Sequence, residues 1–424
     1  MKKTLSKLAI NGGAPVLKHP LKVPYLIGKK EIAVVNKLLK EGPLSDFIGA
    51  PGKFFLGGKH VRSLEAAFVK KFKVKHAVSF NSATTALHGA IVALGIGPGD
   101  EVIVPPYTMS ATPMAVLMNG AVPIFADILP GTFCLDAKSV EKAITKRTKA
   151  IFVANLFGQT ADFGALLPLA KKYKLKIIED NAQAAGALWR GRPAGTIGDI
   201  GVFSFNVHKT IQSGEGGVLV TDNKHYALRA QLCRNHGENL AGVYPEAGLL
   251  VGSNYRMTEL TAALCEVQLS RLEYLTKKRR ALVAYLGKSL KGMKGIIVPP
   301  VSKENYHVYY VYPLTVDEKK LGISRDTLVD AMTAEGHPMS KGYLEPLYLL
   351  PIFQKKQAFN ATHFPFDYRG MKQNYKKGIC PVTERLYEKE FTFTMLCQHP
   401  RTKKDIGSFV RALKKVLAHK NELQ

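Results

Sequence analysis

The feature that most constrains the fold is a regular alternation of two patterns between residues 77 and 220. Short apolar runs rich in β-branched and aromatic residues alternate with longer segments whose apolar residues lie three and four apart. This pattern is typical of buried parallel strands joined by covering helices. The predicted strands are Ala77–Phe80, Glu101–Pro105, Val122–Asp127, Ala150–Asn155, Lys176–Asp180, Gly201–Phe205 and Gly217–Thr221.

The sequence therefore predicts an α/β fold whose large three-layer α/β/α domain holds a mainly parallel seven-stranded sheet. The pattern changes after Gly252, where Thr258–Lys278 predicts one long amphipathic helix ending in a basic cluster. A strand-like run at Tyr306–Leu314 and helical segments at Ser324–Glu335 and Lys404–His419 predict a smaller C-terminal α+β domain. We predict an N-terminal arm at 1–30, a large domain at 31–275 and a small domain at 276–424.

Composition limits the class of protein and its partners. The 424 residues are 46% apolar, enough for a large core, and 60 Lys and Arg against 33 Asp and Glu give a net charge of +27. That charge allows nucleic acid, a membrane surface, nucleotides or phosphorylated cofactors as partners, and the count alone does not choose among them. No apolar run reaches the roughly 18 to 20 residues of a membrane span, and no signal peptide is evident.

The cysteines and histidines indicate neither a disulfide framework nor a metal site. Five scattered cysteines form no C-x-x-C pair, and the twelve histidines show no H-E-x-x-H spacing. We therefore expect a protein of the reducing cytoplasm without a structural metal.

A lysine follows one of the predicted strands. Lys209 lies between the strand that ends at Phe205 and the glycine-rich turn Gly214–Gly217. A lysine in a loop is usually a solvated charge, but ligands collect at the carboxyl ends of strands in open α/β sheets. An amine placed there is suited to form a Schiff base with a carbonyl cofactor.

Two further strand ends carry residues that suit pyridoxal phosphate. Asp180 ends the strand Lys176–Asp180, and a carboxylate against the pyridine nitrogen keeps that ring protonated and electron-accepting. The small hydroxyl-bearing turn Asn81–Leu87 precedes a predicted helix, whose first amides suit a phosphate group. Each of these also has a plain interpretation as a helix N-cap. Together with Lys209 they indicate a cofactor cradle.

At this point the chain resembles the DegT-type sugar aminotransferases, a family of fold-type-I PLP-dependent enzymes. The resemblance extends from Ile10 almost to the C-terminus, and its marks occur in order along the chain. They are Ser82–Leu87, Gly97–Pro105, Glu179–Asp180 with Gln183, Ser204–Lys209 with Gly214–Gly217, and Asn254–Glu259.

The resemblance implies a role for each matching residue. Lys209 would hold the cofactor as a Schiff base and move the proton, Asp180 would face the pyridine nitrogen, and Gln183 would face the ring hydroxyl. The phosphate would be bound by the residues Ala83, Thr84 and Ser204, and by Asn254 from a second subunit. The resemblance therefore implies a homodimer with shared active sites.

The chain departs from the family at the residue that stacks on the cofactor. Relatives usually carry an aromatic ring where this chain has Met109, and a thioether packs less strongly on a ring face. Tyr107 lies nearby and is an alternative stacking residue.

The resemblance further implies an aminotransferase that takes nitrogen from glutamate or glutamine. The acceptor would be a ketosugar, favoured as nucleotide-linked, or a keto-cyclitol. Alternatives are a deoxysugar dehydratase, whose relatives carry His where this chain has Lys209, and a regulatory or nucleic-acid-binding relative. The basic clusters lack any nucleic-acid-binding motif, so no nucleic-acid role is expected. The segment Gly342–Tyr348 is either close to the acceptor or a structural turn.

Overall fold

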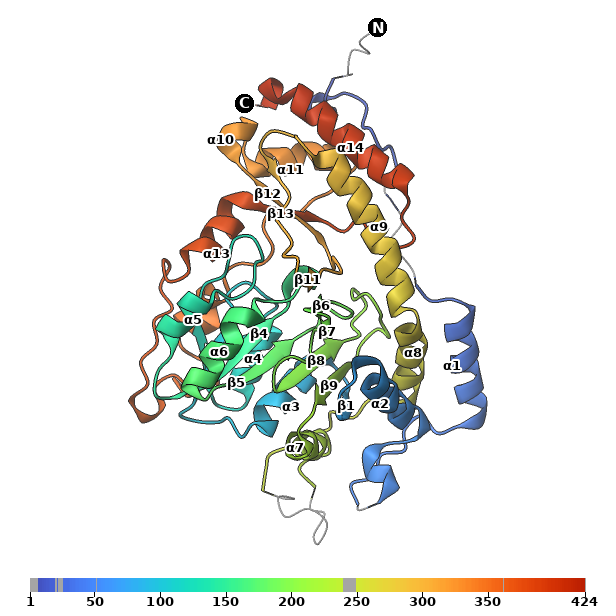
Figure 1. The fold of residues 1–424 in the computed structure, drawn as a ribbon, viewed down its shortest axis with the longest axis vertical. Coiled ribbons are helices and arrows are strands. Elements are labelled where there is room, and N and C mark those ends of the chain that lie inside the picture. Colours follow the sequence, from blue (N-terminus) through green and yellow to red (C-terminus); the bar gives the residue numbers. More distant parts are fainter. Residues whose placement is uncertain are drawn as a thin grey trace.

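The computed structural model describes residues 7–19, 21, 26–50, 52–238, 249–360 and 362–423; parts of the predicted arm, at 1–6, 20 and 22–25, lie outside them. At its centre is a seven-stranded sheet in the order β1-β9-β8-β5-β4-β2-β3 (Figure 1). The strands from β8 to β3 pair in parallel, and β9 pairs antiparallel with β8 and β1. They are β1 (His76–Phe80), β2 (Glu101–Val104), β3 (Val122–Phe125), β4 (Thr148–Ala154), β5 (Lys176–Asp180), β8 (Ile200–Ser204) and β9 (Gly217–Thr221). The predicted mainly parallel sheet is confirmed.

Helices cover both faces of this sheet because side chains alternate along each strand. Ile178 and Val202 point to one core, whereas Ile177 and Phe203 point to the cores on the opposite face. On the first face lie α3 (Ala83–Ala93), α4 (Ala111–Met118) and α7 (Lys224–Arg234); on the second lie α2 (Lys59–Phe72), α5 (Ala137–Ala143), α6 (Phe163–Tyr173) and α8 (Glu259–Ser270). The three-layer α/β/α architecture is therefore confirmed.

A second, smaller core is built by the C-terminal part of the chain. It joins a three-stranded sheet, in the order β10-β12-β13, to helices that pack on it. These elements are α9 (Leu272–Leu290), β10 (Ile296–Ile297), β12 (Tyr312–Val316), α10 (Glu318–Leu321), α11 (Arg325–Ala334), β13 (Phe391–Thr394) and α14 (Lys403–Ala418). The α9 and α14 helices lie side by side at the top of Figure 1. The predicted α+β unit is thus present.

The helix expected at Thr258–Lys278 is two helices. The α8 helix ends at Ser270 and α9 begins at Leu272, so Arg271 separates them and α9 runs on through residue 276. At this break the Arg271 guanidinium bonds to Glu31 Oε1 at 2.8 Å, which ties the helix pair to α1 (Lys29–Glu41). The domain boundary near 276 stays a prediction.

The C-terminal chain also returns to the large sheet. Leu347, Phe353 and Phe366 join the core on the α3 and α4 face. The Tyr375 hydroxyl donates to Pro123 O on β3 at 2.8 Å. Short segments complete this part of the chain and a small third sheet: α12 (Pro351–Gln354), α13 (Pro381–Arg385), β6 (Leu188–Trp189), β7 (Arg192–Pro193) and β11 (Asn305–Tyr306).

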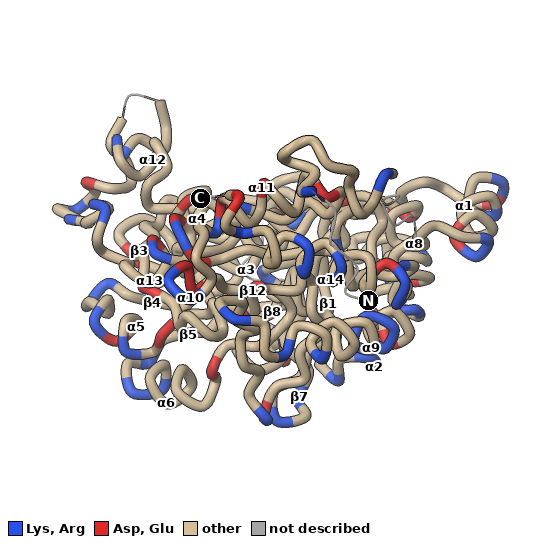
Figure 2. Tube along the Cα trace, turned by 90° about the horizontal axis from the view of Figure 1, so that it is seen from above, with Lys and Arg blue, Asp and Glu red and all other residues tan. Residues whose placement is uncertain are grey.

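The described Lys and Arg residues are spread over many elements of the chain. Figure 2 shows Lys and Arg spread around the periphery, including α1, α5, α6 and α9. All five cysteines are buried free thiols. Among the described residues, no helix combines the length and the apolar character that crossing a bilayer requires.

One glycine in β8 tests how tightly the sheet is packed. A Cβ at Gly201 would lie 1.9 Å from Gly195 O, a backbone atom that cannot move alone. We expect Gly201→Ala to lower the free energy of unfolding by about 1 to 3 kcal/mol or more, measured by urea denaturation at fixed protein concentration. Gly97→Ala is the control, since its Cβ would meet Asn119 O at 3.8 Å. Equal denaturation midpoints for the two variants would contradict this packing.

Candidate active site

The end of β5 carries two carboxylates that point in opposite directions. Glu179 is fully buried and accepts bonds from Gly195 N at 2.7 Å, Gly198 N at 2.7 Å and Asn155 Nδ2 at 2.9 Å. These bonds fix the connection between β5 and β8, so Glu179 has a structural role. The next residue, Asp180, points to the other face of the sheet because strand side chains alternate.

Asp180 is buried and held by two donors. Its Oδ2 accepts from Thr112 Oγ1 at 2.8 Å, and its Oδ1 accepts from Ala182 N at 3.1 Å. Burial raises the pKa of the Asp180 carboxyl, and the Thr112 bond, the Ala182 bond and the charge of Lys209 oppose that rise. The site therefore contains an acidic group that favours a nearby cation.

The Lys209 side chain shares this environment. Its amino nitrogen lies 4.9 Å from the centre of the Tyr310 ring, and burial lowers the pKa of the amine. The charges of Asp180 and Glu215 act in the opposite direction. Because a lower pKa enlarges the fraction of neutral amine, Lys209 is suited to act as a nucleophile and a base.

Strand β9 brings the predicted phosphate residues together. Ser82 caps α3 by accepting from Thr85 N at 3.1 Å, and the first amides of the helix, those of Ala83 and Thr84, have no partner within it. Gly217 pairs with Ser204 across the sheet, and a Cβ at Gly217 would lie 2.7 Å from Ala83 N. Ser204 and the start of α3 therefore flank one glycine.

Gln183 is oriented by bonds at both ends of its amide. Its Oε1 accepts from Phe157 N at 3.0 Å, and its Nε2 donates to the Tyr343 hydroxyl at 3.0 Å. Tyr343 belongs to the segment Gly342–Tyr348, so the structure brings this segment to the candidate site. Its contact with an acceptor stays a prediction.

The two candidates for the stacking residue differ in exposure. Met109 is 53% exposed, whereas Tyr107 is fully buried and its hydroxyl accepts from Tyr343 N at 2.9 Å. Tyr107 is therefore part of the hydrophobic core. Of the two side chains, only Met109 is accessible to a ligand.

Asn254 is exposed beside β1. Its backbone oxygen accepts from Asn81 Nδ2 at 3.3 Å, and its Oδ1 accepts from its neighbour Arg256 N at 3.4 Å. Its reach into the site of a second subunit stays a prediction.

Two residues at the site were missed by sequence reasoning. Thr112 binds Asp180 from α4, and Tyr310 lies against Lys209 from the segment before β12. Neither belongs to a motif, and both are distant in sequence from the groups that they contact. Only the place of Thr112, in the first turn of the helix that follows β2, hints at the same edge of the sheet.

The residues present fit pyridoxal phosphate. The cradle left open by Gly217 and the α3 amides suits a phosphate, Asp180 suits a protonated ring nitrogen, and Lys209 offers the amine. The fold is that of the fold-type-I PLP transferases.

Comparison with known proteins identifies the family within this class. Residues 48–395 match the model of the DegT/DnrJ/EryC1/StrS aminotransferase family. The chain belongs to this family, whose homologues are sugar aminotransferases, and is an enzyme of that class.

Curated relatives and solved structures agree with that assignment. The spore coat polysaccharide biosynthesis protein SpsC of Bacillus subtilis is 35% identical over 81% of this chain and 88% of its own. GDP-perosamine synthase of Caulobacter vibrioides is 39% identical over 70% of this chain and 79% of its own. The solved structure of DesI in the presence of its TDP-sugar product has a TM-score of 0.80 and 28% identity, covering 98% of this chain and 97% of that one.

The Lys209 and Asp180 pair yields a prediction for the cofactor-free protein. Since the Asp180 charge favours the protonated amine, Asp180→Asn should lower the pKa of Lys209 further. The pH dependence of Lys209 modification by trinitrobenzenesulfonate, followed by peptide mass spectrometry, should then shift to lower pH. An unchanged profile would mean that Asp180 carries no charge beside Lys209.

Gly217 tests the phosphate cradle. In Gly217→Ala the new Cβ must displace the backbone of Ser82 or Ala83, so we expect the dissociation constant for pyridoxal phosphate to rise at least about tenfold. Equilibrium titration followed by absorbance measures it, with Gly97→Ala as the control. Wild-type affinity in Gly217→Ala would place the phosphate elsewhere.

Proposed function

We propose that this enzyme uses pyridoxal phosphate bound to Lys209 to transfer an amino group to a ketosugar. The observation that carries the proposal is the half-buried Lys209, whose amine lies against Tyr310 and within the field of Asp180. When bound, pyridoxal phosphate supplies an aldehyde that condenses with amines and a ring that accepts electrons from the substrate carbon.

In this proposal the residues of the chain bind and orient the cofactor and move the proton. Asp180 holds a proton on the ring nitrogen, supported by Thr112 and the Ala182 amide. Lys209, released as a neutral amine, would take the proton from the donor carbon that carries the nitrogen and deliver it to the cofactor's former aldehyde carbon on the other side of that nitrogen. It would repeat this in reverse on the acceptor. Gln183 orients the ring through its amide, which Phe157 N and the Tyr343 hydroxyl hold in place.

The amino donor in this proposal is glutamate or glutamine, which rests on the family resemblance. The acceptor is a ketosugar linked to a nucleotide. Two observations support a nucleotide: the relatives named for GDP-perosamine and TDP-sugar chemistry, and the net charge of +27, which favours an anionic substrate. A free keto-cyclitol is the alternative acceptor.

The proposal includes a homodimer with shared sites. Large apolar side chains are exposed on α1 and close to Asn254, among them Ile32, Leu39 and Val251. A second subunit that covered them would bury this surface and bring Asn254 to the phosphate. The buried thiols suit the reducing cytoplasm, where we place the reaction.

The decisive test separates the first half-reaction from the second. Protein loaded with pyridoxal phosphate and given glutamate or glutamine without acceptor should release one oxo acid per site, measured by coupled assay. Lys209→Ala should slow this release by about 100-fold or more, because it removes the base. Lys171→Ala, which removes an exposed lysine on α6, is the matched control.

A screen of nucleotide ketosugars and keto-inositols with the productive donor then identifies the acceptor. Loss of a sugar hydroxyl without nitrogen transfer would support the dehydratase instead. No oxo acid from either donor would overturn the proposed reaction.

A further inference from the structure

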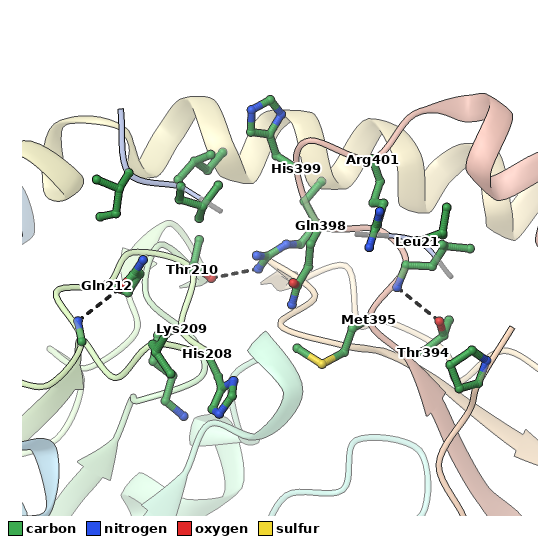
Figure 3. Close-up of a pocket in the computed structure, with 18 of the residues that line it drawn as sticks. Leu21, His208, Lys209, Thr210, Gln212, Thr394, Met395, Gln398, His399 and Arg401 are labelled. Carbon is green, nitrogen blue, oxygen red and sulfur yellow. Dashed lines mark hydrogen bonds between the residues drawn. The ribbon is translucent and has the colours of Figure 1, made fainter. Parts of the chain in front are cut away.

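A cavity of 760 Å³ lies beside the loop that carries Lys209 (Figure 3). The loop 207–214 forms one wall, α8 and α9 contribute Leu264 and Leu275, and the segment 394–401 forms the opposite wall. Phe409 and Leu396 add further apolar surface. The volume is within the range of pockets that bind small molecules, about 300 to 1,000 Å³.

The charges that face this cavity are of one sign. Among the described residues that line it, Arg279 and Arg401 are cationic and none is Asp or Glu. Burial lowers the pKa of His337 to about 4 and the pKa of His399 below its usual value, so these two imidazoles add no charge near pH 7. Polar uncharged groups come from Gln212, Gln398 and Thr394. The cavity therefore combines apolar walls with a surplus of cationic groups.

Among these groups, Arg279 is the one whose charge costs the most free energy to bury. It is only 5% exposed, one guanidinium nitrogen donates to Thr210 Oγ1 at 2.8 Å (dashed line at Thr210 in Figure 3), and its Nε has no partner. Within the part of the chain that the structure describes, no carboxylate pairs with it. Burial accordingly lowers the pKa of Arg279 to about 10. A buried cation without a counter-ion is strongly unfavourable, so an anion in the cavity would stabilise it.

The cavity adjoins the cradle proposed for the cofactor, and Lys209 lines both. The Lys209 amine is associated with Tyr310 and Asp180, and in Figure 3 it points away from α9. Thr210, the next residue, instead bonds to Arg279. Two consecutive residues of one loop therefore have different contacts: Lys209 belongs to the candidate active site, and Thr210 binds Arg279 in the wall of the cavity.

We infer that this cavity binds a small organic anion, whose carboxylate or phosphate pairs with Arg279 while its apolar body packs on Leu264, Leu275 and Phe409. The inference does not rest on the proposed reaction, since none of the groups that it needs takes part in proton transfer. Because Thr210 adjoins Lys209, occupancy of the cavity acts directly on the loop that carries the reacting amine.

The test uses protein saturated with pyridoxal phosphate, so that the cofactor site is filled. The probe is anilinonaphthalene sulfonate, an anion with an apolar body, and its stoichiometry and affinity are measured by calorimetry and fluorescence. We expect one probe per chain and, in Arg279→Met, an affinity lowered by about tenfold or more. Lys277→Met, an exposed lysine on the same helix, should bind as the wild type does.

A second variant covers the case in which Arg279→Met does not fold. Met395→Trp narrows the cavity without changing its charge and should weaken probe binding. Competition by hexanoate and by phenyl phosphate distinguishes the two anionic groups, since the better competitor carries the group that the site prefers. Displacement by neither, or equal binding to wild type and both variants, would overturn the inference.

Discussion

The structure depends on the parallel pairing of β5 with β8. In this register Asp180 lies beside Val202, two residues before β8 ends at Ser204, so both strands end at one edge of the sheet. Parallel strands are buried on both faces, which leaves their carboxyl ends as the place where polar side chains collect. The Lys209 loop, the Asp180 carboxylate and the start of α3 meet there as a consequence of topology.

Burial then shifts the pKa values of Asp180 and Lys209. The same desolvation that raises the pKa of Asp180 lowers that of Lys209, and each charge opposes the shift of the other. The neighbouring Glu179 faces the opposite side of the sheet, where backbone amides and the Asn155 side chain donate to it. Two adjacent carboxylates thus have different roles because strand side chains alternate.

The small domain completes the site through strained backbone. Phe157 and Tyr309 adopt positive φ angles of 58° and 52°, and Tyr310 N donates to Phe157 O at 2.8 Å. Such conformations cost of order 1 to 3 kcal/mol and persist where surrounding contacts require them. In this protein these backbone conformations place Phe157 N where it donates to Gln183 Oε1, and they place the Tyr310 ring against the Lys209 amine. Residues some 150 positions apart therefore act as one unit.

The sequence by itself determined the layered fold, because hydrophobic period and glycine turns are local signals, and its motifs indicated Lys209, Asp180 and the start of α3 as one cradle. It could not place Thr112 or Tyr310, whose contacts join distant segments, and it left open whether the segment that contains Tyr343 lies near the site. It also left Met109 and Tyr107 equivalent until packing buried one of them. Tertiary structure decided these points because exposure and hydrogen bonding depend on which segments meet, and only the folded chain fixes that.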